Sequence, residues 1–399
     1  MHREVVVRRG WIDEDRFQRA LAFCMALPGP EAQQLAMYLG WHLHGYSGGT
    51  FAGAAFIVPS IAVMLALSWL AVAGDGLPAV AGTLLGLQAS VLGLVVDAIA
   101  RLGRRLTGDP WRIGVAVVTY AVLASGLASF PLAIAVAGSV GVAQGWRLRR
   151  VTGATRVNAV ERLPAPSGEA PPRLLAEVRR GARVFAVTFV AWAVPMAVVA
   201  AWRGTGDLLV QIGMFFTRAS FATFGGAYAV LAYVADEAVT RLGWLDATRM
   251  AQGLGLAEST PGPLIMVTHF VGFVAAWNDP GDLPRLQAAV IGGLLATWGT
   301  FLPGFFLVLA GAPLVERIAT NRVVSDALSG ISGAVVGTIA SLATFIATEV
   351  IGNAPAGDAA FAVATGAATF VAVRFAHVPP YAVVPIGAVV GIAWTLARA

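Results

Sequence analysis

Residues 10–13, Gly-Trp-Ile-Asp, recur as residues 243–246, Gly-Trp-Leu-Asp, and residues 28–30, Pro-Gly-Pro, recur as residues 261–263. Both recurrences are separated by the same distance along the chain, so the match runs between them without a gap. A gap-free match that includes a tryptophan and a Pro-Gly-Pro triplet indicates an internal duplication.

The duplication continues along the chain with a slightly larger offset, which pairs Pro59 with Pro303 and Gly86 with Gly330. In the second half, the repeated block follows an apolar segment with Phe-Gly-Gly at residues 224–226, whose equivalent would lie before residue 1. We therefore expect that a first helix is missing from the gene model, and natural loss of one helix is the weaker alternative.

The composition is that of a membrane protein. The chain has 399 residues, of which 57% are hydrophobic and 12% charged, and its mean hydropathy is +0.74. Soluble domains carry about 25% charged residues. All 27 basic residues are Arg, and without Lys the chain can form neither a Walker A loop nor a pyridoxal or retinal Schiff base. The single cysteine, Cys24, excludes an internal disulfide and a Cys-x-x-Cys site.

Most of the positive charge lies in one connector. The net charge is +5, whereas the stretch from Arg147 to Arg183 alone has nine Arg and three acidic residues, a local charge of +6. This stretch is Pro-rich and flanked by apolar runs, so the positive-inside rule predicts a solvated cytoplasmic linker. We expect no nucleic-acid partner, because the excess charge does not lie on a folded soluble face. Regulatory binding of lipid or nucleic acid by the linker is the weaker alternative.

Apolar runs of about 20 residues, the length of a bilayer-spanning helix, occur along the whole chain. The predicted fold class is therefore an all-α polytopic membrane protein. The predicted segments are residues 17–38, 49–73, 78–100, 183–202, 208–235, 247–277, 287–312, 327–350, 359–373 and 381–397, and a hairpin of two short helices over 113–146.

The Arg residues in the loops predict that the two repeats have inverted topology. With a cytoplasmic linker, the loop 101–112 and the loop with Arg317 and Arg322 both lie inside, and their counterparts in the other half lack Arg. Both assignments hold if the helix over 183–202 inverts the second half, as in many secondary transporters. The Arg residues among residues 3–16 would then lie outside. Either the Pro-broken segments are re-entrant, or these Arg residues have a structural or substrate role.

This topology predicts four regions. They are residues 1–146, a first transporter repeat that is incomplete at its N-terminus; residues 147–182, the basic cytoplasmic linker; residues 183–206, a connecting transmembrane helix; and residues 207–399, the second repeat.

The two Pro-Gly-Pro triplets predict helix breaks, because Pro lacks an N–H and clashes with the preceding turn. Breaks at membrane depth are tolerated where the backbone is buried in protein or lines a polar cavity. A half-helix that begins after the triplet presents free N–H groups and a positive dipole end, which together bind anions. Residues 258–260, Glu-Ser-Thr, would supply a polar approach and cap. The alternative is a pair of structural kinks.

Each of four further features has a proposed functional role and a structural alternative. Arg218 would bind an oxyanion or snorkel to the interface. Glu258 would carry a coupling proton or cap the half-helix, and His269 would assist it or be a packed core residue. The Phe-Gly-Gly sequence would let a ligand approach the backbone or allow close helix packing.

Other small-residue and charged patterns predict structural contacts. The Gly-xxx-Gly pairs at Gly82 and Gly86 and at Gly333 and Gly337 are typical of helix contacts rather than phosphate loops. Asp97 and Arg101, at positions i and i+4, predict an ion pair at a helix end.

The repeated motifs resemble the chromate ion transporter family in its long, duplicated form. The resemblance covers essentially the whole chain and is carried by residues 10–13 and 243–246 with residues 26–36 (Ala-Leu-Pro-Gly-Pro-Glu-Ala-Gln-Gln-Leu-Ala), 223–231 (Thr-Phe-Gly-Gly-Ala-Tyr-Ala-Val-Leu) and 255–267 (Gly-Leu-Ala-Glu-Ser-Thr-Pro-Gly-Pro-Leu-Ile-Met-Val). It implies efflux of chromate from the bacterial cytoplasm, with sulfate as a related oxyanion. The family pattern has Phe-Gly-Gly in both halves, whereas this chain has it only at residues 224–226.

The resulting prediction is a secondary active transporter in the bacterial cytoplasmic (inner) membrane that exports chromate and gives chromate resistance. Sulfate or another divalent oxyanion is the alternative substrate, and the alternatives of another class are an intramembrane enzyme that uses Glu31 or Glu258 and an oxyanion sensor or channel. We expect no catalytic residues, metal or cofactor. The expected partners are the transported anion and the lipid bilayer, with a homodimer as an option.

The candidate residues come from the two breaks and the segments beside them. The substrate-binding candidates are Pro28, Gly29, Pro30, Glu31, Gln33, Arg218, Phe224, Gly225, Gly226, Ser259, Thr260, Pro261, Gly262 and Pro263, and the proton-coupling candidates are Glu258 and His269.

Overall fold

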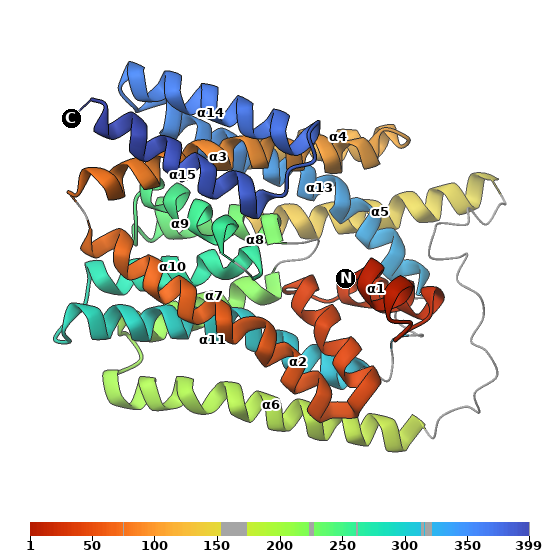
Figure 1. The fold of residues 1–399 in the computed structure, drawn as a ribbon. Coiled ribbons are helices and arrows are strands. Elements are labelled where there is room, and N and C mark those ends of the chain that lie inside the picture. Colours follow the sequence, from red (N-terminus) through yellow and green to blue (C-terminus); the bar gives the residue numbers. More distant parts are fainter. Residues whose placement is uncertain are drawn as a thin grey trace.

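The chain folds as a bundle of helices (Figure 1). The computed structural model describes residues 1–74, 76–152, 174–222, 227–260, 262–312, 315 and 321–398, and these residues form helices and connecting turns without strands. Six helices among them are long and apolar enough to cross a membrane, and the shorter apolar helices pack beside these. The all-α polytopic prediction is confirmed.

The described residues of the first repeat and the connecting helix form eight elements. They are η1 (Arg3–Arg8), α1 (Glu14–Ala26), α2 (Glu31–Ala73), α3 (Pro78–Gly103), η2 (Arg104–Leu106), α4 (Pro110–Ala124), α5 (Phe130–Thr152) and the connecting α6 (Leu174–Arg203).

The second repeat continues to the end of the chain. Its elements are α7 (Leu208–Ala222), α8 (Ala227–Ala235), η4 (Asp236–Arg241), α9 (Ala247–Ser259), η5 (Leu264–Met266), α10 (Val267–Asn278), α11 (Arg285–Gly311), α13 (Arg322–Ala347), η7 (Thr348–Gly352), α14 (Ala356–Arg374) and α15 (Pro380–Leu396).

The duplication seen in the sequence is present in the local structure. Elements η1 and α1 match η4 and α9 at both ends of each element, in the register that aligns the two Pro-Gly-Pro triplets. Asp13 and Asp246 cap α1 and α9 in the same way, each accepting a hydrogen bond at 2.7 Å from the backbone N–H of the third residue after it. Helices α3 and α13 likewise begin and end at equivalent positions, in the register that pairs Pro59 with Pro303. Equivalent sequences therefore form equivalent helices with equivalent caps.

The two repeats have opposite directions, as predicted. Figure 1 shows α5 finishing at the right of the view, whereas α15 finishes at the left, where the C-terminus lies. Helix α6 crosses the molecule along the lower edge of the view, from the side where α5 finishes to the opposite side. In the same view α1 and the kink of α2 both lie toward the right. The chain that runs through α1 and the first part of α2 therefore returns to the end of the molecule from which it started. This arrangement favours the re-entrant alternative for the first Pro-broken segment.

Helix α2 consists of two helices that meet at a break, in agreement with the predicted segments. Residues 17–38 and 49–73 were expected as separate segments, and the helical backbone of Glu31–Ala73 is interrupted between them, at His44 and Gly45. Gly45 has a φ of 65°, which glycine adopts without the cost of a Cβ. The two parts pack against each other, because a Cβ on Gly49 would lie 3.0 Å from the carbonyl oxygen of Met37. The hairpin over 113–146 is confirmed, because α4 ends at Ala124 and α5 begins at Phe130.

Helices of the two repeats approach each other closely at glycine residues. Helix α3 of the first repeat packs against α15 of the second, and an added Cβ on Gly82 would lie 2.7 Å from the carbonyl oxygen of Gly391. The inverted counterpart is α13 against α5, where a Cβ on Gly330 would overlap the carbonyl oxygen of Ala137. Helix α13 also packs against α4, where a Cβ on Gly333 would lie 2.7 Å from the carbonyl oxygen of Arg112. The small residues thus allow backbone contact between repeats, which confirms their predicted packing role.

Of two predictions about charged residues, one is confirmed and the other falls largely outside the described residues. Asp97, buried on α3, forms the predicted ion pair with Arg101 and lies 3.9 Å from Arg374 of the second repeat. The predicted linker, residues 147–182, lies largely outside the described residues. Helix α5 extends into it as far as Thr152, and α6 begins at Leu174.

Candidate functional site

The two Pro-Gly-Pro triplets interrupt helices in matching ways. Between α1 and α2, Gly29 has a φ of 114°, and between α9 and η5, Gly262 has a φ of 149°, values that favour glycine. Pro30 and Pro263 occupy the N-cap positions and provide no side-chain hydrogen bond, unlike Asp13 and Asp246 at the starts of α1 and α9. The first N–H groups after each break are therefore left without a side-chain cap, which is the arrangement that binds anions.

The first break is lined by amide side chains. Gln33 and Gln34 are completely buried, and Gln34 Nε2 donates to the carbonyl oxygen of Pro28 at 2.7 Å. A Cβ on Gly29 would lie 3.0 Å from Gln34 Nε2 and 3.6 Å from Ser220 Oγ of α7. A Cβ on Gly304 of α11 would lie 3.4 Å from Gln33 Oε1. The first break therefore packs against helices of the second repeat.

The second break packs against the first repeat. Gly262 contacts Ser60 of α2, and Thr260 Oγ1 lies 3.4 Å from the sulfur of Met64 on the same helix. The hydroxyls of Ser259 and Thr260 both donate to the carbonyl oxygen of Leu256, at 2.8 and 2.6 Å. These two residues therefore close α9. The expectation that they cap the following helix is wrong, because its N-cap, Pro263, receives no side-chain hydrogen bond.

Three predicted residues lie on the helices beside the two turns. Arg218 is exposed on α7, whereas its neighbour Ser220 is buried beside Gly29. Glu258 is half-buried in the last turn of α9, and Glu31 is half-buried at the first position of α2. The structure thus brings Glu31 to the first break and leaves Arg218 on a different face of α7 from Ser220.

His269 is a buried residue between α10 and α11. Its Nδ1 is 2.9 Å from Thr297 Oγ1, whose hydroxyl also donates to the carbonyl oxygen of Gly293. A Cβ on Gly293 would lie 2.8 Å from His269 Nε2, so the ring fills the space between the two helices. Phe224, Gly225, Gly226 and Pro261, the remaining predicted site residues, lie outside the described residues.

The sequence reasoning missed Ser60 and Ser220. Ser60 directly follows Pro59, and the duplication pairs Pro59 with Pro303, so the prolines mark where each repeat approaches the other's break. The equivalent of Ser60 is Gly304, which lies beside Gln33. Paired prolines in α2 and α11 were therefore a signal for these positions. Ser220 offers no comparable signal, because no proline of the duplicated pattern marks its position in the sequence.

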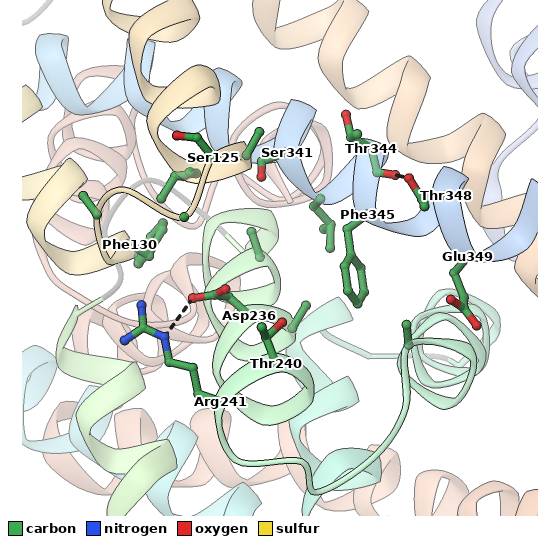
Figure 2. A pocket seen from close by; sticks show the side chains of 18 residues that line it. Ser125, Phe130, Asp236, Thr240, Arg241, Ser341, Thr344, Phe345, Thr348 and Glu349 are labelled. Carbon is green, nitrogen blue, oxygen red and sulfur yellow. Dashed lines mark hydrogen bonds and ion pairs between the residues drawn. The ribbon is translucent and has the colours of Figure 1, made fainter. Parts of the chain in front are cut away.

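A separate cavity of about 510 Å³ lies between the two repeats (Figure 2). The turn from α4 to α5 forms one side, and α8, η4, α13 and η7 form the other. Arg241 Nε is 3.5 Å from Asp236 Oδ2, and Glu349 accepts a hydrogen bond from Thr248 at 2.6 Å. Among the residues described as lining this cavity, two carboxylates accompany one guanidinium, so it is less suited to a dianion than the breaks.

Two inverted repeats, each with a helix broken between the ends of the molecule, define a polytopic membrane protein of the inverted-repeat transporter class. The chain belongs to the chromate transporter family, whose sequence model matches residues 1–142 and 210–392. The match to both halves agrees with the duplication.

Curated relatives align with most of this chain. The chromate transport protein of Pseudomonas aeruginosa is 31% identical over 342 residues, which cover 85% of this chain and 73% of the relative. That of Cupriavidus metallidurans is 28% identical over 361 residues, 89% of this chain and 78% of the relative. A probable chromate transport protein of Synechococcus elongatus is 25% identical over 355 residues, 89% of this chain and 80% of the relative. No solved structure matches the chain.

Proposed function

We propose that this protein is a secondary active transporter that exports chromate across the bacterial inner membrane and thereby gives chromate resistance. The proposal is supported by the family and by the names of the relatives in Pseudomonas aeruginosa and Cupriavidus metallidurans. The observation that carries it is the pair of broken helices whose N-termini have no side-chain cap. Such N-termini suit the oxygens of a tetrahedral anion.

In this mechanism the oxyanion binds at the breaks, between the two repeats. Each break packs against helices of the other repeat, Gly29 near Ser220 and Gly262 against Ser60. A rocking motion of one repeat against the other would therefore change the surroundings of both breaks together and alternate access to the two sides. The energy source would be an ion gradient, because the chain has no Lys with which a Walker A loop would hold nucleotide phosphates.

Arg218 and Glu258 have separate proposed roles. Arg218 is exposed on α7, close in sequence to Ser220, so its guanidinium would attract the anion on its way to the first break. Glu258 is half-buried one turn before the second break and would carry a coupling proton.

Chromate uptake into everted membrane vesicles tests this function. Vesicles with the protein are expected to accumulate chromate, and R218A and E258Q are expected to reduce the rate. The exposed residues Arg285 and Glu14 provide the matched controls R285A and E14Q, which should transport like the wild type. Full activity in both R218A and E258Q would refute the two roles. Equal chromate accumulation with and without the protein would refute the function.

A further inference from the structure

An apolar groove of about 430 Å³ lies on the outside of the bundle, where α3 of the first repeat meets α13, η7 and α14 of the second. Its walls carry small side chains, among them Ala347 of α13 and Ala367 of α14, which leave the space between the helices open. None of the described residues that line it is charged. Val96 and Val363 line the groove and are exposed, so it opens away from the bundle toward the bilayer.

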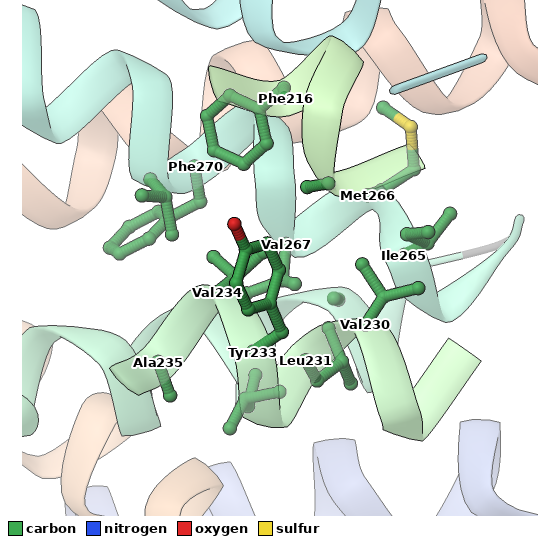
Figure 3. Packing of buried hydrophobic residues seen from close by; sticks show 14 of the residues in the cluster. Phe216, Val230, Leu231, Tyr233, Val234, Ala235, Ile265, Met266, Val267 and Phe270 are labelled. Atoms are coloured by element: carbon green, nitrogen blue, oxygen red, sulfur yellow. The ribbon is translucent and has the colours of Figure 1, made fainter. Parts of the chain in front are cut away.

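Elsewhere in the bundle, the side chains of the protein fill the space between helices. Figure 3 shows Leu231 of α8 packed in one cluster with Met266 and Phe270, and all three are fully buried. Protein interiors are close-packed in this way because an empty space forfeits contacts. In the membrane, the apolar material available to fill the groove is a lipid acyl chain.

One end of the groove is basic. Arg374 follows Phe370 of the groove by one turn and lies on the same side of α14. Its Nη1 is 3.9 Å from one carboxylate oxygen of buried Asp97, whose other oxygen pairs with Arg101. Two guanidiniums therefore share one carboxylate, and the cluster has a net charge of +1. The remaining N–H donors of the guanidiniums suit the oxygens of a phosphate.

The basic end lies at the depth of the lipid headgroups. Helix α14 is long and apolar enough to cross the membrane, and Arg374 is its last residue. From Ala362 at the far end of the groove to Arg374, the helix rises about 18 Å. One leaflet contains about 15 Å of hydrocarbon. A chain that reaches Ala362 therefore has its phosphate close to Arg374.

The first repeat has the same helix contact without the charges. Helix α3 packs against α14 at Gly93 as α13 packs against α4 at Gly337, with an added Cβ 2.8 and 2.9 Å, respectively, from a backbone nitrogen of the partner helix. In this alignment, Ser341 and Ala124 take the places of the acid and the Arg of α14. Close packing of these helices therefore does not require the ion cluster, and the cluster is available for another role.

We propose that the groove binds one anionic phospholipid. Its phosphate accepts hydrogen bonds from Arg374 and Arg101, and one acyl chain lies along the groove. Basic residues beside a groove between membrane helices are typical of such lipid sites. Because α3 belongs to the first repeat and α13 and α14 belong to the second, the bound lipid contacts both repeats and stabilises their contact.

Native mass spectrometry of the purified full chain tests this site. The protein is released from detergent micelles that contain equal amounts of dioleoylphosphatidylglycerol and dioleoylphosphatidylcholine. The wild type is expected to retain one phosphatidylglycerol in preference to phosphatidylcholine. R374Q should reduce this preference about fivefold, the contribution of one basic residue near a membrane surface, whereas R374K should keep most of it. R398Q is the matched control, because Arg398 pairs with Asp358 at the opposite end of α14.

A second variant tests the groove and leaves the ion cluster intact. In V363W, the indole occupies the open side of the groove, so retention of phosphatidylglycerol should fall although both Arg residues are present. Val363 is exposed, and folding is therefore expected to be preserved. V389W on α15 is the matched control, because Val389 is also exposed but does not line the groove. Free glycerol 3-phosphate should not displace the lipid, because it has no acyl chain.

Four results would overturn the inference. Equal retention of the two lipids by the wild type would show only unselective lipid around the helices. A lower unfolding midpoint in R374Q with an unchanged lipid preference would limit Arg374 to a structural role beside Asp97. Unchanged retention in V363W would place the lipid elsewhere. Displacement by glycerol 3-phosphate would show a site for a free phosphate instead of a lipid.

Discussion

The contact between Gly262 and Ser60 offers a sharp test of how the second break is held. A Cβ added to Gly262 would overlap the Ser60 hydroxyl and lie 2.9 Å from Ser60 Cβ, and the φ of 149° is unfavourable for any residue with a side chain. Backbone strain contributes about 1–3 kcal/mol, and the overlap contributes about 1–3 kcal/mol more. We therefore expect G262A to lower the unfolding free energy by about 2–6 kcal/mol.

The two contributions can be separated by a second substitution. In S60G/G262A the overlap is removed and the strain remains, so the double variant should regain about 1–3 kcal/mol relative to the sum of the single variants. G29A is the matched control. Its φ of 114° carries a similar strain, but its Cβ would lie 3.0 Å from Gln34 Nε2 and 3.6 Å from Ser220 Oγ, so overlap is smaller.

Thermal unfolding of the purified variants in detergent, together with chromate uptake, measures these effects. The midpoint should fall by several degrees in G262A and less in G29A, and S60G/G262A should recover part of the loss. A G262A protein as stable as the wild type, or a double variant no better than G262A, would refute the packing of Ser60 against this turn.

Three further predictions concern helix ends and contacts between repeats. D13A and D246A should each lower stability by about 1 kcal/mol through loss of an equivalent cap, whereas D13N and D246N should not; unequal losses on thermal unfolding would contradict the equivalence. G86V should destabilise the bundle by about 1–3 kcal/mol, because Gly86 contacts the carbonyl of Gly387, while G114A should be neutral since no atom lies within 4 Å of its Cβ. Arg203 lowers the pKa of Asp282 in the loop between α10 and α11, so this ion pair stabilises the protein at neutral pH and is lost as the pH falls through the lowered pKa. The unfolding midpoint of the wild type should therefore drop more on acidification than that of D282N, and parallel curves would refute the link.

The sequence predicted the features that depend on local chemistry. The breaks at the two Pro-Gly-Pro triplets and the turn between Ala124 and Phe130 follow from residues close to one another in the chain. The gap between the two helices of α2 was also expected, and it lies at Gly45, where glycine adopts a positive φ.

The parts that were not predicted depend on contacts between the repeats. The exposure of Arg218 and the burial of Ser220 follow from which face of α7 meets the rest of the bundle, and a single helix does not encode that choice. The difference between Gln34 and Val267 is visible when the repeats are aligned, whereas the hydrogen bond from the Gln34 amide back to Pro28 is revealed only by the folded chain.

Chromate flux into proteoliposomes that contain only the purified protein tests the central claim most directly. The account predicts that an imposed ion gradient or membrane potential drives chromate across the bilayer without nucleotide, and that the flux falls in G262A and recovers in part in S60G/G262A. The account would be contradicted if proteoliposomes that contain folded protein took up chromate no faster than protein-free liposomes under every imposed gradient.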